Sequence, residues 1–202
     1  MQETETFEIR LLTASDAGAW AELRLEALEQ DPEAFSSSVE EHSRLTNAEI
    51  EKRVTCDPEN HFVVGAFANG RLLGMAGFYR ETGPKLRHKG HVWGVYVKAA
   101  MRGRGLGRRL METLLACAMH VPGLEQIQLS VASSQKGAAS LYQALGFEPF
   151  AREVRALKVN GQYLDEDFLV LWLPGGRGNG VGRFVDQTAP EVEIEAGHLR
   201  HR

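Results

Sequence analysis

The segment Arg102-Gly103-Arg104-Gly105-Leu106-Gly107 constrains this chain more than any other. It follows an apolar run, Val92 to Val97, that is typical of a strand, and it opens a stretch with helical apolar spacing. Glycines at alternate positions keep side chains away, so backbone N–H groups can closely approach an anion. The positive end of the following helix points to the same place, and the arginines add charge and donors. The segment therefore predicts a strand, loop and helix that together bind phosphate.

The spacing of this loop differs from that of the commoner phosphate-binding loops. No Lys-Ser or Lys-Thr follows the glycines, which argues against a nucleoside triphosphatase. The third glycine comes one residue too early for a dinucleotide fingerprint, and the segment lies in the middle of the chain. The alternative is an ordinary glycine-rich turn before a helix, which accounts for one glycine but not for three with two arginines.

Arg102-x-x-Gly105-x-Gly107 resembles the acetyl-CoA pyrophosphate loop of the GCN5-related N-acetyltransferase (GNAT) superfamily. A second block, from Ala138 to Phe147, is similar to the family pattern A-x-x-L-Y-x-x-x-G-F. The two blocks occur in the family's order, and the resemblance covers residues 7–173. It implies the acyl-CoA N-acyltransferase fold, a mixed and mostly antiparallel sheet with helices on both faces.

Apolar periodicity and turn signals predict the same α/β class. Asn69-Gly70 and Asn160-Gly161 are typical of type I′ hairpin turns. Alternation along the strand before the glycine loop places Trp93 and Tyr96 on opposite faces of the sheet. The predicted strands are 7–11, 62–67, 71–80, 89–97, 126–131, 147–159 and 162–173, and the predicted helices are 13–31, 47–55, 105–120 and 138–145.

Length and composition predict one domain over residues 1–173, which the resemblance identifies as a GNAT domain, and a flexible, glycine-rich and charged tail over 174–202. The formal net charge of −4 argues against nucleic acid as a main ligand. Cys56 and Cys117 suit free thiols in a reducing compartment. The polar, acidic start of the chain is unlike a secretory signal, and no apolar run approaches the ~20 residues that span a bilayer. We therefore expect a cytoplasmic protein without a membrane partner.

The resemblance assigns a donor site to particular residues. It implies that backbone groups of the stretch Val95, Tyr96 and Val97 pair with the pantetheine arm of acetyl-CoA, and that an N–H there polarises the thioester carbonyl. The diphosphate is expected on Arg102, Gly103, Arg104, Gly105, Leu106, Gly107 and Arg108. Gln135 stands where family members often have an asparagine that touches CoA. Tyr142 matches the family tyrosine that protonates the departing thiolate, with packing as its alternative role.

The amine must lose a proton before it attacks, and two residues are candidates for the base. His91, on the strand before the loop, titrates in the right range, and Glu81 ends the preceding strand. Either residue could instead be an ordinary solvated strand-end residue. Cys117 falls on the apolar stripe of its helix, so direct attack in a ternary complex is favoured over a covalent acyl-enzyme. The histidines lack metal-ligand spacing, so no metal is expected.

The sequence thus predicts an enzyme that transfers an acetyl group from acetyl-CoA to a primary amine. Two alternatives stay open: a non-catalytic acyl-CoA-binding sensor, and an enzyme that acetylates protein N-termini or lysines. Dimers are common in the family, so a homodimer is compatible with the resemblance. The resemblance implies that residues 33–54 build the acceptor cleft. The residues between Asp31 and Cys56 carry no pattern that identifies the acceptor.

Overall fold

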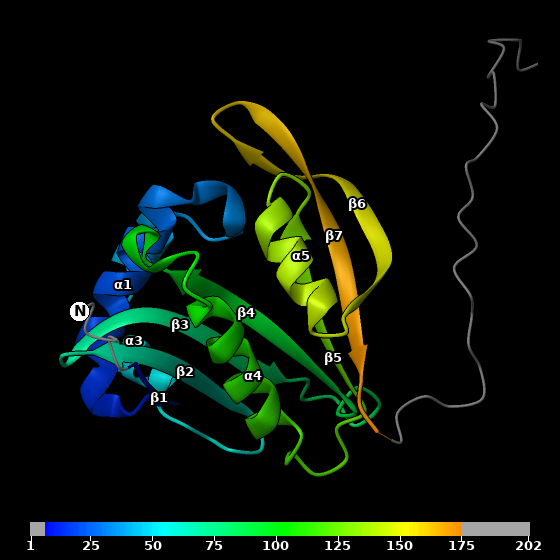
Figure 1. Cartoon of the computed structure of the whole chain (residues 1–202), viewed down its shortest axis with the longest axis horizontal. Coiled ribbons are helices and arrows are strands. Elements are labelled where there is room, and N and C mark those ends of the chain that lie inside the picture. The colour runs from blue at the N-terminus through cyan, green and yellow to red at the C-terminus, as the bar shows by residue number, and fades with distance from the viewer. Residues whose placement is uncertain (1–6, 175–202) are drawn as a thin grey trace, which may run out of the picture.

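A computed structural model describes residues 7–174, in which one sheet has the strand order β1-β2-β3-β4-β5-β7-β6 (Figure 1). Every neighbouring pair is antiparallel except β4 and β5, which run parallel. The predicted mixed, mostly antiparallel sheet is confirmed. Its strands are β1 (Glu8–Leu11), β2 (His61–Ala68), β3 (Arg71–Arg80), β4 (Lys89–Val97), β5 (Gln126–Ala132), β6 (Glu148–Val159) and β7 (Gln162–Trp172).

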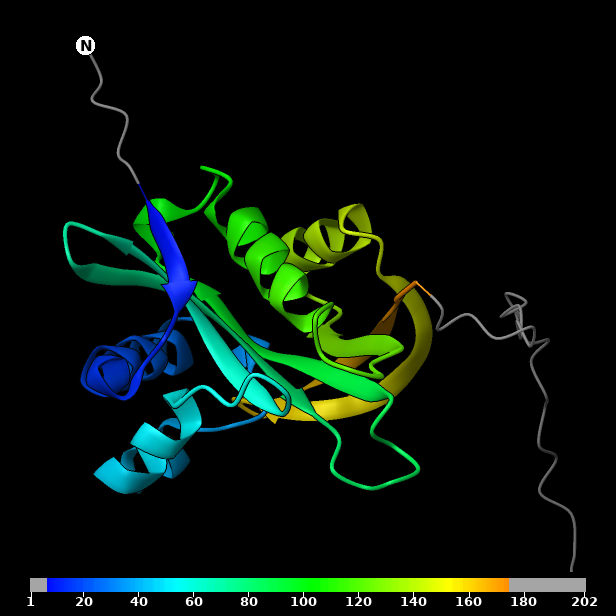
Figure 2. The ribbon, with the colours of Figure 1, turned by 90° about the horizontal axis from the view of Figure 1, so that it is seen from below.

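Helices cover both faces of the sheet, as predicted (Figure 2). The first face carries α1 (Ala17–Gln30), α2 (Val39–Ser43) and α3 (Asn47–Val54), and the second carries α4 (Leu106–Ala118) and α5 (Lys136–Ala144). Short 3-10 turns are η1 (Ala14–Asp16), η2 (Pro32–Ala34) and η3 (Ala99–Met101). None of the described helices combines the length and apolar composition needed to cross a bilayer.

Each face has its own core. Leu106, Leu110 and Leu114 recur along α4 at helical spacing and are almost fully buried against β2 and β3, as their pattern predicts. On the other face, Trp20 of α1 is buried among residues from α1 and from β2 to β4. Cys117 continues the α4 stripe but is only half-buried. The two cores hold the sheet between them and fix the direction in which α4 begins.

The local signals explain most element boundaries. Asn69, Gly70, Asn160 and Gly161 all have positive φ, which confirms the two predicted type I′ hairpins. The helix α2 was not among the predicted elements because it has only five residues. A capping box at Ser38 begins it, since the Ser38 hydroxyl accepts from the Glu41 amide and the Glu41 carboxylate accepts from the Ser38 amide.

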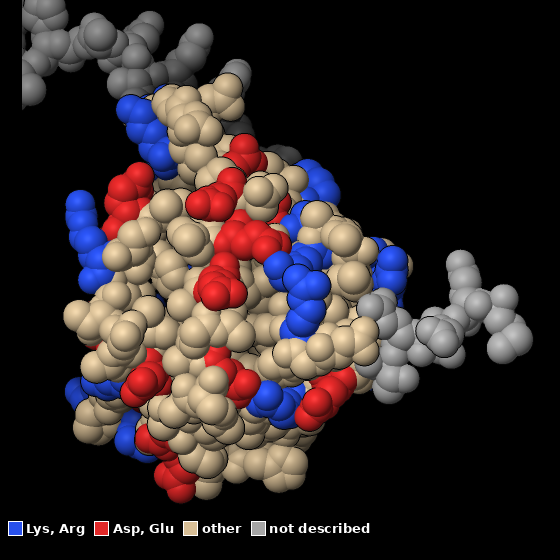
Figure 3. Space-filling view, turned by 90° about the vertical axis from the view of Figure 1, so that its left-hand side faces the viewer, with Lys and Arg blue, Asp and Glu red and all other residues tan. Residues whose placement is uncertain are grey.

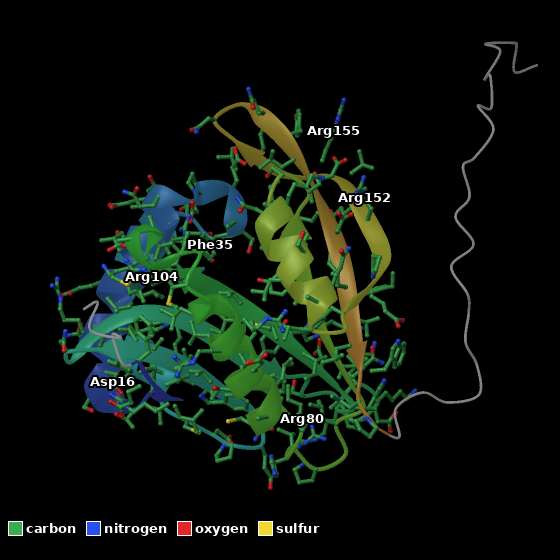
Figure 4. The ribbon with its side chains drawn as sticks, in the orientation of Figure 1. Asp16, Phe35, Arg80, Arg104, Arg152 and Arg155 are labelled. Carbon is green, nitrogen blue, oxygen red and sulfur yellow. The ribbon has the colours of Figure 1, made fainter. Side chains whose placement is uncertain are left out.

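A partly buried ion pair fixes the start of the first helical segment. The two guanidinium nitrogens Nη1 and Nη2 of Arg10 each lie 2.8 Å from a carboxylate oxygen of Asp16. Asp16, labelled in Figure 4, also accepts from the Thr13 amide at 2.8 Å. These hydrogen bonds hold the pKa of Asp16 well below its usual range. The contacts connect β1 to the turn that leads into α1.

The strands β4 and β5 separate soon after they pair. Their pairing runs only from Lys89 with Gln126 to His91 with Gln128 within the described residues. Beyond it, Gly94 has a φ of +63°, and the register with β3 shifts between Met75 and Gly77. An extra residue in one strand of a ladder is a β-bulge, which bends that strand. The bulge therefore helps to open a gap in the sheet.

The same bulge overturns the prediction that Trp93 and Tyr96 lie on opposite faces. Both pack against the α1 core, and the Trp93 ring lies 6.2 Å from that of Trp20 in an edge-on contact. Strict alternation fails here because the bulge adds one residue between them.

The predicted domain boundary at residue 173 stays a prediction. The chain leaves β7 at Trp172, and Pro174 is the last described residue. The predicted tail lies, apart from Pro174, outside the described residues.

Candidate active site

A cavity of about 590 Å³ occupies the gap where β4 and β5 separate. It extends from the start of α4 to α5 and to the turn after α1. Eleven of the twelve predicted cofactor-binding residues line it: Val95, Tyr96, Val97, Arg102, Gly103, Gly105, Leu106, Gly107, Arg108, Gln135 and Tyr142. Ala34 and Phe35, from the region expected to build the acceptor cleft, also line it, and so do Asp31, Val92, Trp93, Gly94, Ser130 and Leu141. The structure therefore brings the two sequence blocks together at one site.

The glycine loop presents unpaired backbone amides to this cavity. Gly103 and Gly105 have φ values of +74° and +77°, a conformation that strongly favours glycine. Gly105 caps α4, and its carbonyl accepts the first helical hydrogen bond, from the Arg109 amide at 3.1 Å. The amides of residues 106–108 precede that bond and have no acceptor inside the helix. Together with the helix dipole they form a site for an anion.

The arginine side chains of the loop do not all face the cavity. Arg102 donates from Nε to the Val97 carbonyl at 2.9 Å and from Nη2 to the Asp31 carboxylate, so it ties the loop to β4 and to the end of α1. Arg104 is in the same loop but does not line the cavity (Figure 4). Arg108 lines it and approaches Glu112 at 3.4 Å. The roles of these arginines in diphosphate binding stay predictions.

Beside the loop, β4 offers a free edge. After His91, no described residue of β5 pairs with β4, although β4 continues to Val97. An unpaired edge of this kind can accept an extended ligand as an added strand. The Val97 carbonyl is the exception, because it already accepts from Arg102.

Tyr142 closes the other side of the cavity. The side chain lies on α5, is 7% exposed and packs edge-on against Phe147, with ring centres 6.1 Å apart. Within residues 7–174 its hydroxyl has no hydrogen-bond partner. Burial raises the pKa of Tyr142 to about 12, so the phenol carries its proton at neutral pH. Gln135, immediately before α5, also lines the cavity.

The two candidate bases lie together, outside the lining of the cavity. His91 Nε2 lies 3.0 Å from Glu81 Oε1, and the Tyr79 ring stacks on His91 with centres 4.8 Å apart. Burial lowers the pKa of His91, although Glu81 opposes that change. Neither residue lines the cavity, although Val92, which directly follows His91 on β4, does. Their part in the reaction stays a prediction.

Charged side chains of both signs are interspersed on the face that carries α1 (Figure 3).

In the described part of the chain, His, Cys, Asp and Glu side chains form no group of three that could hold a metal.

The comparisons with known proteins agree with this geometry. Residues 20–147 match the acetyltransferase (GNAT) family. The chain belongs to this family. The predicted family and its enzyme class, acetyltransferase, are therefore confirmed.

Two relatives and one solved structure illustrate the likeness. The N-alpha-acetyltransferase RimI of Mycobacterium tuberculosis is 32% identical over 79% of this chain and 89% of its own length. The L-methionine sulfoximine/L-methionine sulfone acetyltransferase of Pseudomonas aeruginosa is 31% identical over 54% of this chain and 63% of its own length. The Salmonella typhimurium protein yncA, solved with acetyl-CoA, has a TM-score of 0.70 at 22% identity, covering 89% of this chain and 99% of that one.

Proposed function

We propose that this GNAT protein transfers the acetyl group of acetyl-CoA to a primary amine by direct attack in a ternary complex. One observation carries the proposal: unpaired amides at the start of α4 and the buried Tyr142 hydroxyl line the same cavity. A site of this kind can hold an anionic diphosphate at one end and protonate a leaving group at the other.

In the proposed complex, the diphosphate of acetyl-CoA accepts hydrogen bonds from the amides of residues 106–108, and Arg108 adds positive charge. The pantetheine arm lies along the free edge of β4, beside Val95. A backbone N–H of that strand donates to the thioester oxygen and stabilises the negative charge that develops on it. Gln135 supplies a side-chain amide at the cavity wall.

The amine nitrogen attacks the carbonyl carbon, and the carbon–sulfur bond then breaks. The departing thiolate takes the proton of the Tyr142 hydroxyl, which suits this role because burial keeps it protonated. The attacking nitrogen loses its proton, and the pair His91 and Glu81 is proposed to accept it through water. The lowered pKa of His91 favours the neutral imidazole that such a base requires.

The cysteines support direct attack over an acyl-enzyme. Burial raises the pKa of the Cys117 thiol, and Cys117 does not line the cavity. It borders a smaller groove that also contains Cys56. A thiol with a raised pKa is a poor nucleophile at neutral pH.

The named activities of two relatives bear on the acceptor. One relative is named as an N-alpha-acetyltransferase and the other as acting on L-methionine sulfoximine and L-methionine sulfone. A small amine or an N-terminal amine is therefore included in the proposal. We also propose a cytoplasmic location. A homodimer is a further proposal, which sedimentation analysis tests.

The experiment is a calorimetric titration with acetyl-CoA followed by a screen of amines with thiol release as the readout. Saturable binding and amine-dependent thiol release are expected. Binding without release for any amine or peptide would favour the sensor alternative. Absence of acetyl-CoA binding would refute the proposal.

A further inference from the structure

Arg24 is a buried cation without a counter-ion from the protein. It lies on the face of α1 that packs into the core, and its side chain is 7% exposed. Its Nη1 atom is fully covered and has no hydrogen-bond partner. Within residues 7–174, the guanidinium group makes neither a hydrogen bond nor an ion pair.

The guanidinium lies directly behind the wall of the acetyl-CoA cavity. Its central carbon is 4.4 Å from the centre of the Phe35 ring, and Phe35 lines the cavity. A Cβ atom added to Gly94, another lining residue, would be 3.5 Å from Nη1. Figure 4 labels Phe35 beside the gap between the α1 side and α5. Arg24 is thus next to the strand residue that precedes Val95.

The surrounding charges do not neutralise Arg24. Its pKa is lowered by burial and by the positive charge of Arg53. The pKa of His42 is lowered by burial and, to a smaller extent, by the charges of Arg24 and Arg53. Two acidic groups near the end of α1 are engaged elsewhere, because Glu26 pairs with Lys98 and Asp31 pairs with Arg102. A buried charge is costly unless it is paired. An anion brought by a ligand would supply the missing partner.

We propose that Arg24 binds a carboxylate of the acceptor, so that the substrates are small amino acids. This inference rests on the proposed function. The reacting carbonyl is proposed to lie beside Val95, one residue from Gly94, so amine and carboxylate must be close in the acceptor. An α-amino acid carries both groups on one carbon. A lysine side chain within a protein has no such carboxylate, and neither does a simple alkylamine.

The chemistry of the group suits this role. A guanidinium presents parallel N–H donors that match the two oxygens of a carboxylate. The Phe35 ring beneath it holds its plane without competing for those donors. An internal ion pair with a protein acid would fill the site permanently, and the described residues provide none.

The test compares acceptors that differ only at the carboxylate. L-amino acids and their carboxamides are assayed by thiol release with the wild-type protein, Arg24→Met and the control Arg53→Met. Arg53 is an exposed cation near Arg24, so the control removes charge without removing the proposed contact. The wild type and Arg53→Met should prefer the acid over the amide by at least about 10-fold in kcat/KM. Arg24→Met should lose that preference and use acid and amide equally.

A binding measurement keeps the inference separate from the proposed function. N-acetyl-L-amino acids and their carboxamides are compared by thermal shift, with and without CoA. The acids alone should raise the melting temperature of the wild type, and Arg24→Met should lose that response. Equal use or equal binding of acids and amides by the wild type, or an unchanged preference in Arg24→Met, would overturn the inference. Loss of acetyl-CoA binding alone would instead count against the proposed function.

Discussion

Replacing Tyr142 by phenylalanine separates its proposed chemical role from its packing role. The substitution removes one oxygen and keeps the ring that contacts Phe147. The hydroxyl has no partner among residues 7–174, so no hydrogen bond is lost inside the described protein. We therefore expect the free energy of unfolding to change by less than about 1 kcal/mol.

The effect on turnover should be much larger than the effect on stability. A positioned general acid contributes about 10²- to 10⁴-fold to a rate. Its loss corresponds to about 3–5 kcal/mol in the activation free energy of the step in which the thiolate departs. The affinity for acetyl-CoA should stay nearly the same, because the amides of residues 106–108 are untouched. Since the pKa of Tyr142 is about 12, deprotonation of this group should not lower kcat below about pH 11.

The assay is steady-state thiol release by the wild type, Tyr142→Phe and the control Tyr163→Phe, with melting curves for each. Tyr163 is an exposed tyrosine on β7 and does not line the cavity. We expect kcat to fall at least about 100-fold in Tyr142→Phe alone. A Tyr142→Phe variant with wild-type kcat, or one that changes only the KM for acetyl-CoA, would refute the reasoning.

Three further predictions concern other parts of the chain. His91→Gln should remove the acidic limb of the kcat/KM profile, which lies below about pH 6.5 because burial lowers the pKa of His91; a retained limb would mean that another group is the base. Asp16→Asn should lower the melting temperature at pH 7 and make its decline from pH 5 to pH 3 shallower. The reason is that a carboxylate with a depressed pKa stabilises the fold above its unfolded value of ~3.9 and loses that effect as the pH falls; parallel curves would contradict this. Gly105→Val should weaken acetyl-CoA binding about 5- to 30-fold in a calorimetric titration, from the ~1–2 kcal/mol cost of its left-handed conformation; an unchanged affinity would argue against the loop geometry.

The sequence predicted the sheet well because its signals are local. The strand β3 occupies Arg71–Arg80 as predicted, since a hairpin turn precedes it and its apolar run is continuous. The short helix α2 was not predicted, although the capping box at Ser38 is a sequence signal for it. The prediction of strict alternation along β4 assumes that Gly94 is an ordinary strand residue. A glycine inside a strand often marks a bulge, and that signal would have corrected the faces of Trp93 and Tyr96.

The donor side of the candidate site was predicted residue by residue, whereas the acceptor side was predicted only as a region, residues 33–54. The glycine loop and the Tyr142 block are continuous in sequence, so their pattern can be recognised directly. Phe35 and Asp31 reach the cavity through the packing of α1 and η2 on distant strands, which no short pattern encodes. One sequence signal could have indicated that Arg24 is buried: it follows Trp20 by four residues, within the apolar stripe of α1.

A crystal structure of the protein with CoA bound tests the central claim most directly. The account predicts that diphosphate oxygens lie about 3 Å from the backbone nitrogens of residues 106–108, with the pantetheine arm in the gap between β4 and β5. A diphosphate bound elsewhere, or a loop whose amides turn away from it, would contradict the account.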